Sequence, residues 1–154
     1  MKNADEEEPG GELCIQTVAM PADTNPSGDI FGGWLLAQMD IAGGIAARNL
    51  SGGRTVTIAV ESMTFKRPVK VGDVVSCYAT LERQGRTSVT FRVEVWSRRH
   101  ESFVREKVTE GVFTYVAIGA DGRPREIEQE TMTCLLYTSP SPRDRQKSRM
   151  PSSA

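Results

Sequence analysis

One carboxylate stands out in this chain of 154 residues because it lies inside a long apolar segment. Asp40 is flanked by Met39 and Ile41 in the run from Phe31 to Leu50, where most positions are apolar or glycine. An unpaired buried carboxylate is strongly destabilising, so such a group is paired, protonated or functional. Asp40 is therefore a candidate general base or nucleophile, although a hydrogen bond to a neighbouring loop explains it equally well.

The start of the same segment provides candidate hydrogen-bond donors. Residues 25–29 have turn chemistry and predict a loop. A helix that follows this loop would expose the N–H groups of Gly32 and Gly33, which carry partial positive charge and are accessible to a ligand oxygen. Glycine costs a helix up to about 1 kcal/mol relative to alanine, so we expect another backbone to pack close to the helix glycines. These are Gly32, Gly33, Gly43 and Gly44.

The apolar pattern indicates which elements position these groups. Apolar residues lie on nearly every side of the segment from Phe31 to Leu50, which predicts a helix surrounded by protein, and the NLSGGR sequence ends it. Alternating β-branched and aromatic residues predict five strands, at Glu12–Met20, Thr55–Phe65, Asp73–Arg83, Thr87–Arg98 and Glu106–Ile118. This order predicts an α+β fold in which an antiparallel sheet wraps around one long central helix.

Composition and charge indicate a single domain of ordinary size. With 38% hydrophobic residues, 25% charged residues and a formal net charge of -1, the chain is neither disordered nor suited to broad nucleic-acid binding. The apolar runs are too short for a membrane span, and the acidic start lacks a signal-peptide pattern. We therefore expect a cytoplasmic protein with no nucleic-acid or membrane partner, in which residues 1–11 form a flexible tail.

Cysteine and histidine usage predicts no metal site. Cys14, Cys77 and Cys134 form no CxxC pair and are expected to be small core residues. The single histidine, His100, lies among charged residues and is expected to face solvent.

The C-terminal segment differs from everything before it. Residues 134–154 are rich in serine, proline and arginine, and no apolar period follows Tyr137. Residues 134–144 and 148–154 match two parts of a translated sequencing adapter in one reading frame, with three index residues between them. We interpret residues 134–154 as translated adapter and expect that the native C-terminus was cut off near Thr133. The predicted domain then covers residues 12–130, and residues 131–154 form a disordered tail.

Several long motifs resemble one known family. The run MPADTNPSGDIFGGWLLAQMD, followed by VTIAVESMTFKRPVKVGDVV and later by GRTS and VEVW, closely resembles bacterial hotdog-fold acyl-CoA thioesterases of the YciA type. The resemblance covers roughly residues 12–125 and implies a homodimer with a continuous sheet, assembled further into a hexamer as a trimer of dimers. It implies a hydrolase of fatty acid metabolism that converts fatty and short acyl-CoA to free acid and CoA without a metal or other cofactor.

The residues can support this chemistry only if two chains meet. Thioester hydrolysis needs a donor for the developing oxyanion and a group that activates water or attacks directly. Gly32 and Asp40 supply both, but eight helical residues separate them by roughly 12 Å. Each must lie about 3 Å from the reacting atoms, so the partner subunit must supply one of them. The resemblance implies the same shared site and adds Asn25 as a polar partner for the water or the thioester.

Residues at turns are candidates for contacts to the phosphates of CoA, because basic and hydroxyl side chains there can reach a nucleotide. Taken singly, each basic residue is more often a solvated surface charge, and the family pattern is what favours a role. The expected substrate-binding residues are Gly33, Lys66, Arg67, Arg86, Thr87 and Ser88.

Two other functions stay open on the sequence. A non-catalytic acyl-CoA-binding hotdog module would keep the CoA contacts and have no use for Asp40. A hotdog dehydratase or hydratase is a further alternative, but such sites use a histidine beside the acid, and His100 falls at a strand end far from the helix.

Overall fold

The computed structural model describes residues 8–99 and 101–128. It contains one long helix, one short 3-10 helix and five strands, and every predicted element is confirmed within one or two residues. In chain order these are β1 (Glu12–Val18), η2 (Pro21–Asp23), α1 (Gly32–Ser51), β2 (Thr55–Phe65), β3 (Val74–Gln84), β4 (Ser88–Arg98) and β5 (Arg105–Ala117).

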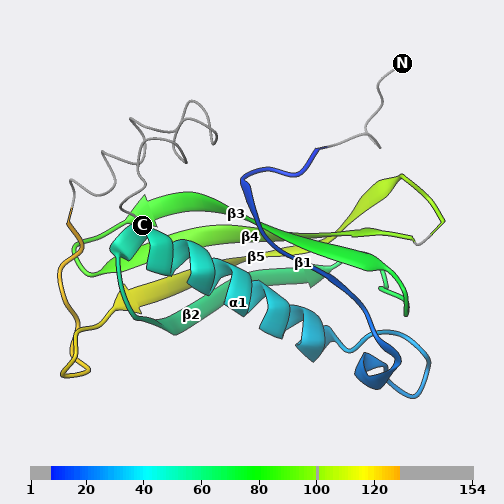
Figure 1. The fold of residues 1–154 in the computed structure, drawn as a ribbon, viewed down its shortest axis with the longest axis horizontal. Coiled ribbons are helices and arrows are strands. Elements are labelled where there is room, and N and C mark those ends of the chain that lie inside the picture. Colours follow the sequence, from blue (N-terminus) through cyan, green and yellow to red (C-terminus); the bar gives the residue numbers. More distant parts are fainter. Residues whose placement is uncertain (1–7, 100, 129–154) are drawn as a thin grey trace, which may run out of the picture.

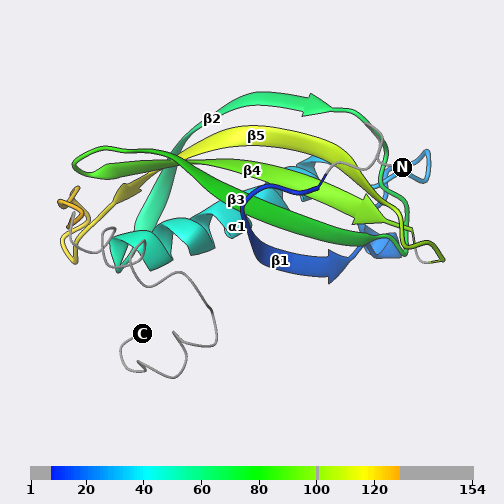
Figure 2. The ribbon, with the colours of Figure 1, turned by 90° about the horizontal axis from the view of Figure 1, so that it is seen from above.

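The five strands form one antiparallel sheet in the order β1-β3-β4-β5-β2. α1 lies along one face of this sheet (Figure 1), and the sheet curves over the helix (Figure 2). The predicted α+β arrangement of a sheet wrapped around a central helix is therefore confirmed. β2 pairs only with β5 and therefore lies at one edge of the sheet.

The core lies between α1 and the concave face of the sheet. The helix buries residues at three- and four-residue spacing, as one face of a helix does. These are Leu35, Met39, Ala42, Gly43, Ala47, Leu50 and Ser51. The sheet contributes alternate residues of its central strands, including Val93 and Val95 of β4 and Phe113 of β5, all fully buried. Cys77 also lies in this core, as predicted.

The opposite face of α1 is apolar but exposed in the single chain. Ile41 is 51% exposed, and Leu36 and Ile45 are each 39% exposed. On the edge strand β2, Ile58 is 58% exposed. The prediction of a helix surrounded by protein is thus wrong for one protomer, because α1 packs on the sheet through one face only.

The helix ends at the predicted position. Gly52 adopts a left-handed conformation (φ 80°), and its N–H donates to the Arg48 carbonyl at 2.8 Å. A residue without Cβ takes this conformation without steric strain, which explains the glycine after the last helical turn.

The N-terminal segment is attached to the sheet further upstream than predicted. The Gly10 N–H donates to the Glu94 carboxylate at 3.2 Å, and Glu8 pairs with Arg105 at 2.8 Å. Residues 8–11 of the expected tail 1–11 therefore lie against β4 and β5. The predictions for residues 1–7, His100 and the tail beyond residue 128, which includes Cys134 and the adapter match, fall outside the described residues.

No helix in residues 8–99 and 101–128 is both long enough and apolar enough to cross a membrane.

Candidate active site

Two hydroxyl groups from the sheet hold the Asp40 carboxylate. The Thr57 hydroxyl on β2 donates to Asp40 Oδ1 at 2.7 Å, and the Tyr115 hydroxyl on β5 lies 3.2 Å from the same oxygen. The Tyr115 hydroxyl also donates to the Asp40 backbone carbonyl at 2.9 Å. The carboxylate is therefore oriented by hydrogen bonds from neighbouring strands, and it is only partly buried.

The Tyr115 phenol stays protonated in this arrangement. Burial raises its pKa above the ordinary value, and the neighbouring Asp40 carboxylate raises it further, because a phenolate there would lose solvent and face a negative charge. Tyr115 can therefore act on Asp40 only as a hydrogen-bond donor.

Within the described chain, Gly43 is the α1 glycine that a close neighbour requires, and this neighbour is a side chain and not the backbone that the sequence predicted. A Cβ on Gly43 would lie 2.2 Å from the Tyr115 hydroxyl, so only glycine leaves room for the phenol that reaches Asp40. A Cβ on Gly32 would meet the Phe65 ring at 3.5 Å, and one on Gly33 would meet nothing within 4 Å.

Gly32 and Gly33 begin α1, as predicted, and present free backbone donors. The first backbone hydrogen bonds of the helix run from the N–H groups of Trp34 and Leu35 to the Phe31 carbonyl. The N–H groups of Gly32 and Gly33 precede these bonds and have no acceptor in the described part of the chain. These donors point out of the helix N-terminus, where its partial positive charge is concentrated. They lie roughly 12 Å from Asp40 along the same helix, so one chain does not bring them together.

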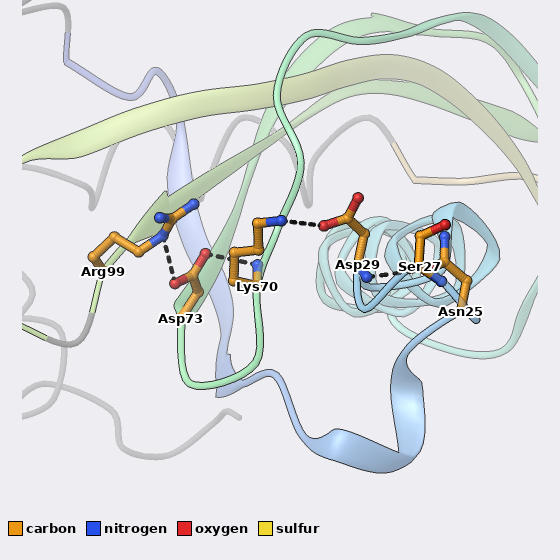
Figure 3. Close-up of polar contacts among 6 residues, drawn as sticks. All are labelled: Asn25, Ser27, Asp29, Lys70, Asp73 and Arg99. Carbon is orange, nitrogen blue, oxygen red and sulfur yellow. Dashed lines mark hydrogen bonds and ion pairs between the residues drawn. The ribbon is translucent and has the colours of Figure 1, made fainter.

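Asn25 lies in the loop before α1 and organises it. Its Oδ1 accepts the N–H groups of Ser27 at 2.9 Å and Asp29 at 3.0 Å (Figure 3). The side-chain oxygen is therefore committed to the turn. Only the side-chain amide N–H groups of Asn25 remain to contact a water or a substrate.

A chain of polar contacts ties this loop to the β2–β3 turn (Figure 3). The Lys70 ammonium pairs with the Asp29 carboxylate, and the Lys70 N–H donates to Asp73 at 3.0 Å. Asp73 is only 1% exposed, and the Arg99 guanidinium lies 2.9 Å from its other oxygen. The buried role of Asp73 was not predicted, because the sequence shows only an acidic residue directly after the Val71–Gly72 turn.

The candidate CoA contacts fall at opposite ends of the sheet. Lys66 and Arg67 follow β2 beside the start of α1, since Phe65 packs on Gly32. The segment Arg86–Ser88 lies at the β3–β4 turn, because Ser88 pairs with Val116 near the other end of the sheet. β2 spans 11 residues, so these two groups lie roughly 30 Å apart in one chain.

Ion pairs engage both basic groups. Arg67 lies 3.9 Å from Glu106, and Arg86 lies 2.6 Å from Glu126. All four side chains are at least half exposed, and exposed pairs of this kind stabilise a fold by less than about 1 kcal/mol, so a phosphate could displace either acidic partner.

Among the residues that the structure describes, no three His, Cys, Asp or Glu side chains gather in a group that could hold a metal ion. Burial raises the pKa of the Cys77 thiol to about 12, which leaves it a neutral core group.

Comparison with known proteins shows which family this chain belongs to. Residues 27–103 match the model of the thioesterase superfamily. The acyl-CoA thioester hydrolase YciA of Escherichia coli is 53% identical over 125 residues, which cover 79% of this chain and 95% of the relative. The corresponding enzyme of Salmonella typhimurium is 54% identical over 122 residues, which cover 77% of this chain and 92% of the relative.

Solved structures of thioesterases have the same fold as this chain. A hexameric thioesterase from Yersinia pestis superimposes with a TM-score of 0.77 at 52% identity, covering 79% of this chain and 99% of that one. A hexameric hotdog-fold thioesterase from Campylobacter jejuni superimposes with a TM-score of 0.76 at 45% identity, covering 80% and 96%. This chain therefore belongs to the YciA-type acyl-CoA thioester hydrolases of the thioesterase superfamily and has their hotdog fold.

Proposed function

We propose that this protein hydrolyses acyl-CoA thioesters to a free acid and CoA, with Asp40 as the general base or nucleophile. The main support within the chain is the hydrogen-bonded setting of Asp40, whose carboxylate is oriented by Thr57 and Tyr115. The close relatives that are named acyl-CoA thioester hydrolases support the choice of substrate.

Two versions of the chemical step use the same groups. As a base, Asp40 takes a proton from water while the water oxygen adds to the thioester carbonyl carbon. The tetrahedral intermediate then collapses, the C–S bond breaks, and the proton passes to the departing CoA sulfur. As a nucleophile, Asp40 adds to the carbonyl, the C–S bond breaks and CoA thiolate is expelled. Water then hydrolyses the resulting anhydride, which releases the free acid and restores the Asp40 carboxylate, and the proton that this water loses passes to the CoA thiolate. Both versions use only protein groups and water.

The oxyanion donor comes from the partner subunit in this proposal. Gly32 N–H is free and points out of the helix start, but it is roughly 12 Å from Asp40 of its own chain. Antiparallel pairing of two α1 helices about a two-fold axis would bring Gly32 of one chain to Asp40 of the other, giving two sites per dimer. The exposed apolar residues Ile41 and Ile45 on α1, and Ile58 on the edge strand β2, offer the surface for such pairing.

Asn25 acts as a donor in this site. Since its Oδ1 is occupied by two backbone N–H groups, its amide nitrogen is the group left to contact the thioester oxygen or the attacking water. In this proposal Asn25 therefore both forms the turn through its Oδ1 and contacts the reacting groups through its amide nitrogen.

The CoA moiety would be bound by more than one subunit. Lys66 and Arg67 lie near the helix start, and Arg86 with Thr87 and Ser88 lies at the far end of the sheet, so one nucleotide could reach both groups only in an assembly. Hexameric relatives support a hexamer here, and its arrangement as a trimer of dimers is part of the proposal. A cytoplasmic location and a place in fatty acid metabolism stay predictions.

The two alternative functions have less support than hydrolysis. A dehydratase site would need a histidine beside the acid, and the described residues contain no histidine, since the one histidine of the chain is His100. A non-catalytic acyl-CoA-binding module would not need a carboxylate oriented by two hydroxyl groups.

Release of free thiol from a series of acyl-CoAs, from acetyl to palmitoyl, tests the proposal. The matched control is Asp40→Asn, which keeps an oxygen to accept the Thr57 and Tyr115 hydroxyls. We expect wild-type turnover and a loss of about 10²- to 10⁴-fold in Asp40→Asn, with the oligomer unchanged. Equal turnover by the two proteins would refute the role of Asp40, and binding of acyl-CoA without turnover by the wild type would favour the non-catalytic module.

A further inference from the structure

The loop before α1 is held from outside by an ion pair. Within the described chain, the one side chain from outside the loop that hydrogen-bonds to residues 25–29 is Lys70, whose ammonium donates to the Asp29 carboxylate (Figure 3). The tip of the loop is exposed at Gly28, which has φ 90°. The first buried apolar side chain after the tip is Ile30, which is 6% exposed. The Lys70–Asp29 pair is therefore the side-chain contact that fixes the position of the loop itself.

Asp29 carries this restraint directly to Asn25. The Asn25 N–H donates to the Asp29 carbonyl at 2.7 Å, and the Asp29 N–H donates to Asn25 Oδ1 at 3.0 Å. The side-chain oxygen and nitrogen of Asn25 belong to one planar amide, so fixing the oxygen also fixes the direction of the nitrogen. This nitrogen is the donor that the proposed function assigns to the reaction. The direction in which it points therefore depends on where Asp29 lies.

The β2–β3 turn holds Lys70 in place for this contact. The Lys70 N–H donates to Asp73 Oδ2 at 3.0 Å, and the Asp73 N–H donates to the Lys70 carbonyl at 3.0 Å. Arg99 lies 2.9 Å from the other oxygen of Asp73, so this buried carboxylate has a compensating charge. The preceding residue, Val69, is 2% exposed and accepts the Ile30 N–H at 2.9 Å. The backbone of Lys70 is thus fixed beside the loop.

We propose that Lys70 is a positioning residue for catalysis, whose ion pair with Asp29 orients the side-chain amide of Asn25 toward the reacting groups. The inference rests on the proposed thioesterase function and adds Lys70 and Asp29 to the residues that serve it. Lys70 contacts neither the substrate nor Asp40 in this role, so its whole effect passes through Asn25. A displacement of a catalytic group by about 1 Å can lower a rate by about 10²-fold, so a surface pair of small intrinsic strength is sufficient.

Four variants of the full-length protein probe the pair. Lys70→Met removes the charge and keeps the length of the side chain, Lys70→Arg keeps the charge, and Asp29→Ala removes the other partner. Arg92→Met is the matched control, because Arg92 and Glu82 form an ion pair with side chains 39% and 33% exposed, close to the 47% and 34% of Lys70 and Asp29. The neighbours of Arg92 along β4 are buried in the core, so Arg92 lies on the face of the sheet away from α1.

The measurements are kcat and KM for butyryl-CoA, with light scattering to follow the oligomer. We expect Lys70→Met and Asp29→Ala each to lower kcat by about three- to fivefold, the scale of an exposed ion pair, with KM changed by less than about twofold. The double variant should be no slower than either single variant, because both remove the same pair. Lys70→Arg should recover most of the loss, and Arg92→Met should keep the wild-type kcat.

A double-mutant cycle with Asn25→Ala separates positioning from a general structural effect. We expect Asn25→Ala alone to lower kcat by about tenfold or more, as the loss of a donor does. In that background Lys70→Met should change kcat by less than about 1.5-fold, because the donor that it orients is already gone. A residue that only stabilises the fold would lower kcat by the same factor in both backgrounds.

Several results would overturn the inference. One is an unchanged kcat in Lys70→Met, or a loss of the same size in Arg92→Met. Another is a rise in KM at constant kcat, which would make Lys70 a CoA contact. Equal effects of Lys70→Met with and without Asn25 would also exclude the positioning role. If the wild type hydrolyses no acyl-CoA, the proposed function fails and this inference with it. Normal wild-type turnover, a slow Asn25→Ala variant and equal effects in the cycle would remove this inference alone.

Discussion

Replacing Gly32 by proline would remove one backbone N–H at the start of α1 and leave the helix in place. Gly32 is the first helical residue, where proline is tolerated because this N–H has no intrahelical acceptor. Phe31 before it has ψ 137°, within the range that a residue preceding proline prefers. The substitution therefore tests the donor separately from the fold.

The size of the effect follows from the role of the donor. If the Gly32 N–H stabilises the oxyanion of the partner's reaction, its loss lowers kcat by about 10²- to 10³-fold, the range found for single oxyanion donors. The matched control, Gly32→Ala, keeps the N–H and places a Cβ 3.5 Å from the Phe65 ring, an ordinary contact. We expect Gly32→Ala to keep most of the activity.

The assay is steady-state release of CoA thiol from butyryl-CoA, with thermal unfolding and light scattering to show that both variants remain folded and assembled. Wild-type turnover in a folded Gly32→Pro protein would refute the donor assignment. An equal loss in both variants would also refute the reasoning, because it would attribute the effect to added bulk and not to the missing N–H.

Three further predictions concern the groups around this site. Tyr115→Phe keeps the ring but removes the one hydroxyl proton that the Asp40 carbonyl and the Asp40 carboxylate share. The free energy of unfolding should therefore fall by about 1–2 kcal/mol in urea titrations, and kcat should fall at unchanged oligomeric state. Gly43→Ala should destabilise the protein by about 1–3 kcal/mol despite its better helix propensity, because its Cβ would displace the Tyr115 hydroxyl; a gain in stability would contradict the packing. Arg67→Ala and Arg86→Ala should raise KM for acyl-CoA more than they lower kcat, and an unchanged KM would return both to ordinary surface charges.

Local sequence patterns predicted the elements because each pattern reflects one local cause. The alternation of Val89, Phe91, Val93 and Val95 predicted β4, and all four side chains are buried in the core. The glycine pair after Leu50 predicted the helix end, where Gly52 adopts the left-handed conformation. Periodicity and turn chemistry act over a few residues, so they can be recognised without the tertiary fold.

The surroundings of Asp40 could not be predicted in this way. Tyr115 lies 75 positions from Asp40 along the chain, and nothing near either residue indicates that the β5 phenol reaches the helix. The reason for Gly43 could not be predicted either. The sequence suggested a neighbouring backbone, whereas the structure shows that the Tyr115 side chain from β5 requires the glycine. Contacts between distant segments depend on strand order and register, which a single sequence does not reveal.

The contacts of the loop before α1 show the same limit. The turn-forming role of Asn25 followed from residue types alone. The link from Asp29 through Lys70 to the buried Asp73 needed the β2–β3 turn to lie beside that loop (Figure 3).

Complementation between two inactive chains tests most directly whether the site is shared between subunits. One chain carries Asp40→Asn and the other Gly32→Pro, and the two are co-expressed with different tags. In a shared site, each mixed dimer contains one site with Asp40 and the Gly32 N–H both intact. Random pairing of equal amounts then restores about a quarter of wild-type activity. Activity no higher than that of either parent, in preparations shown to contain mixed dimers, would contradict the shared site.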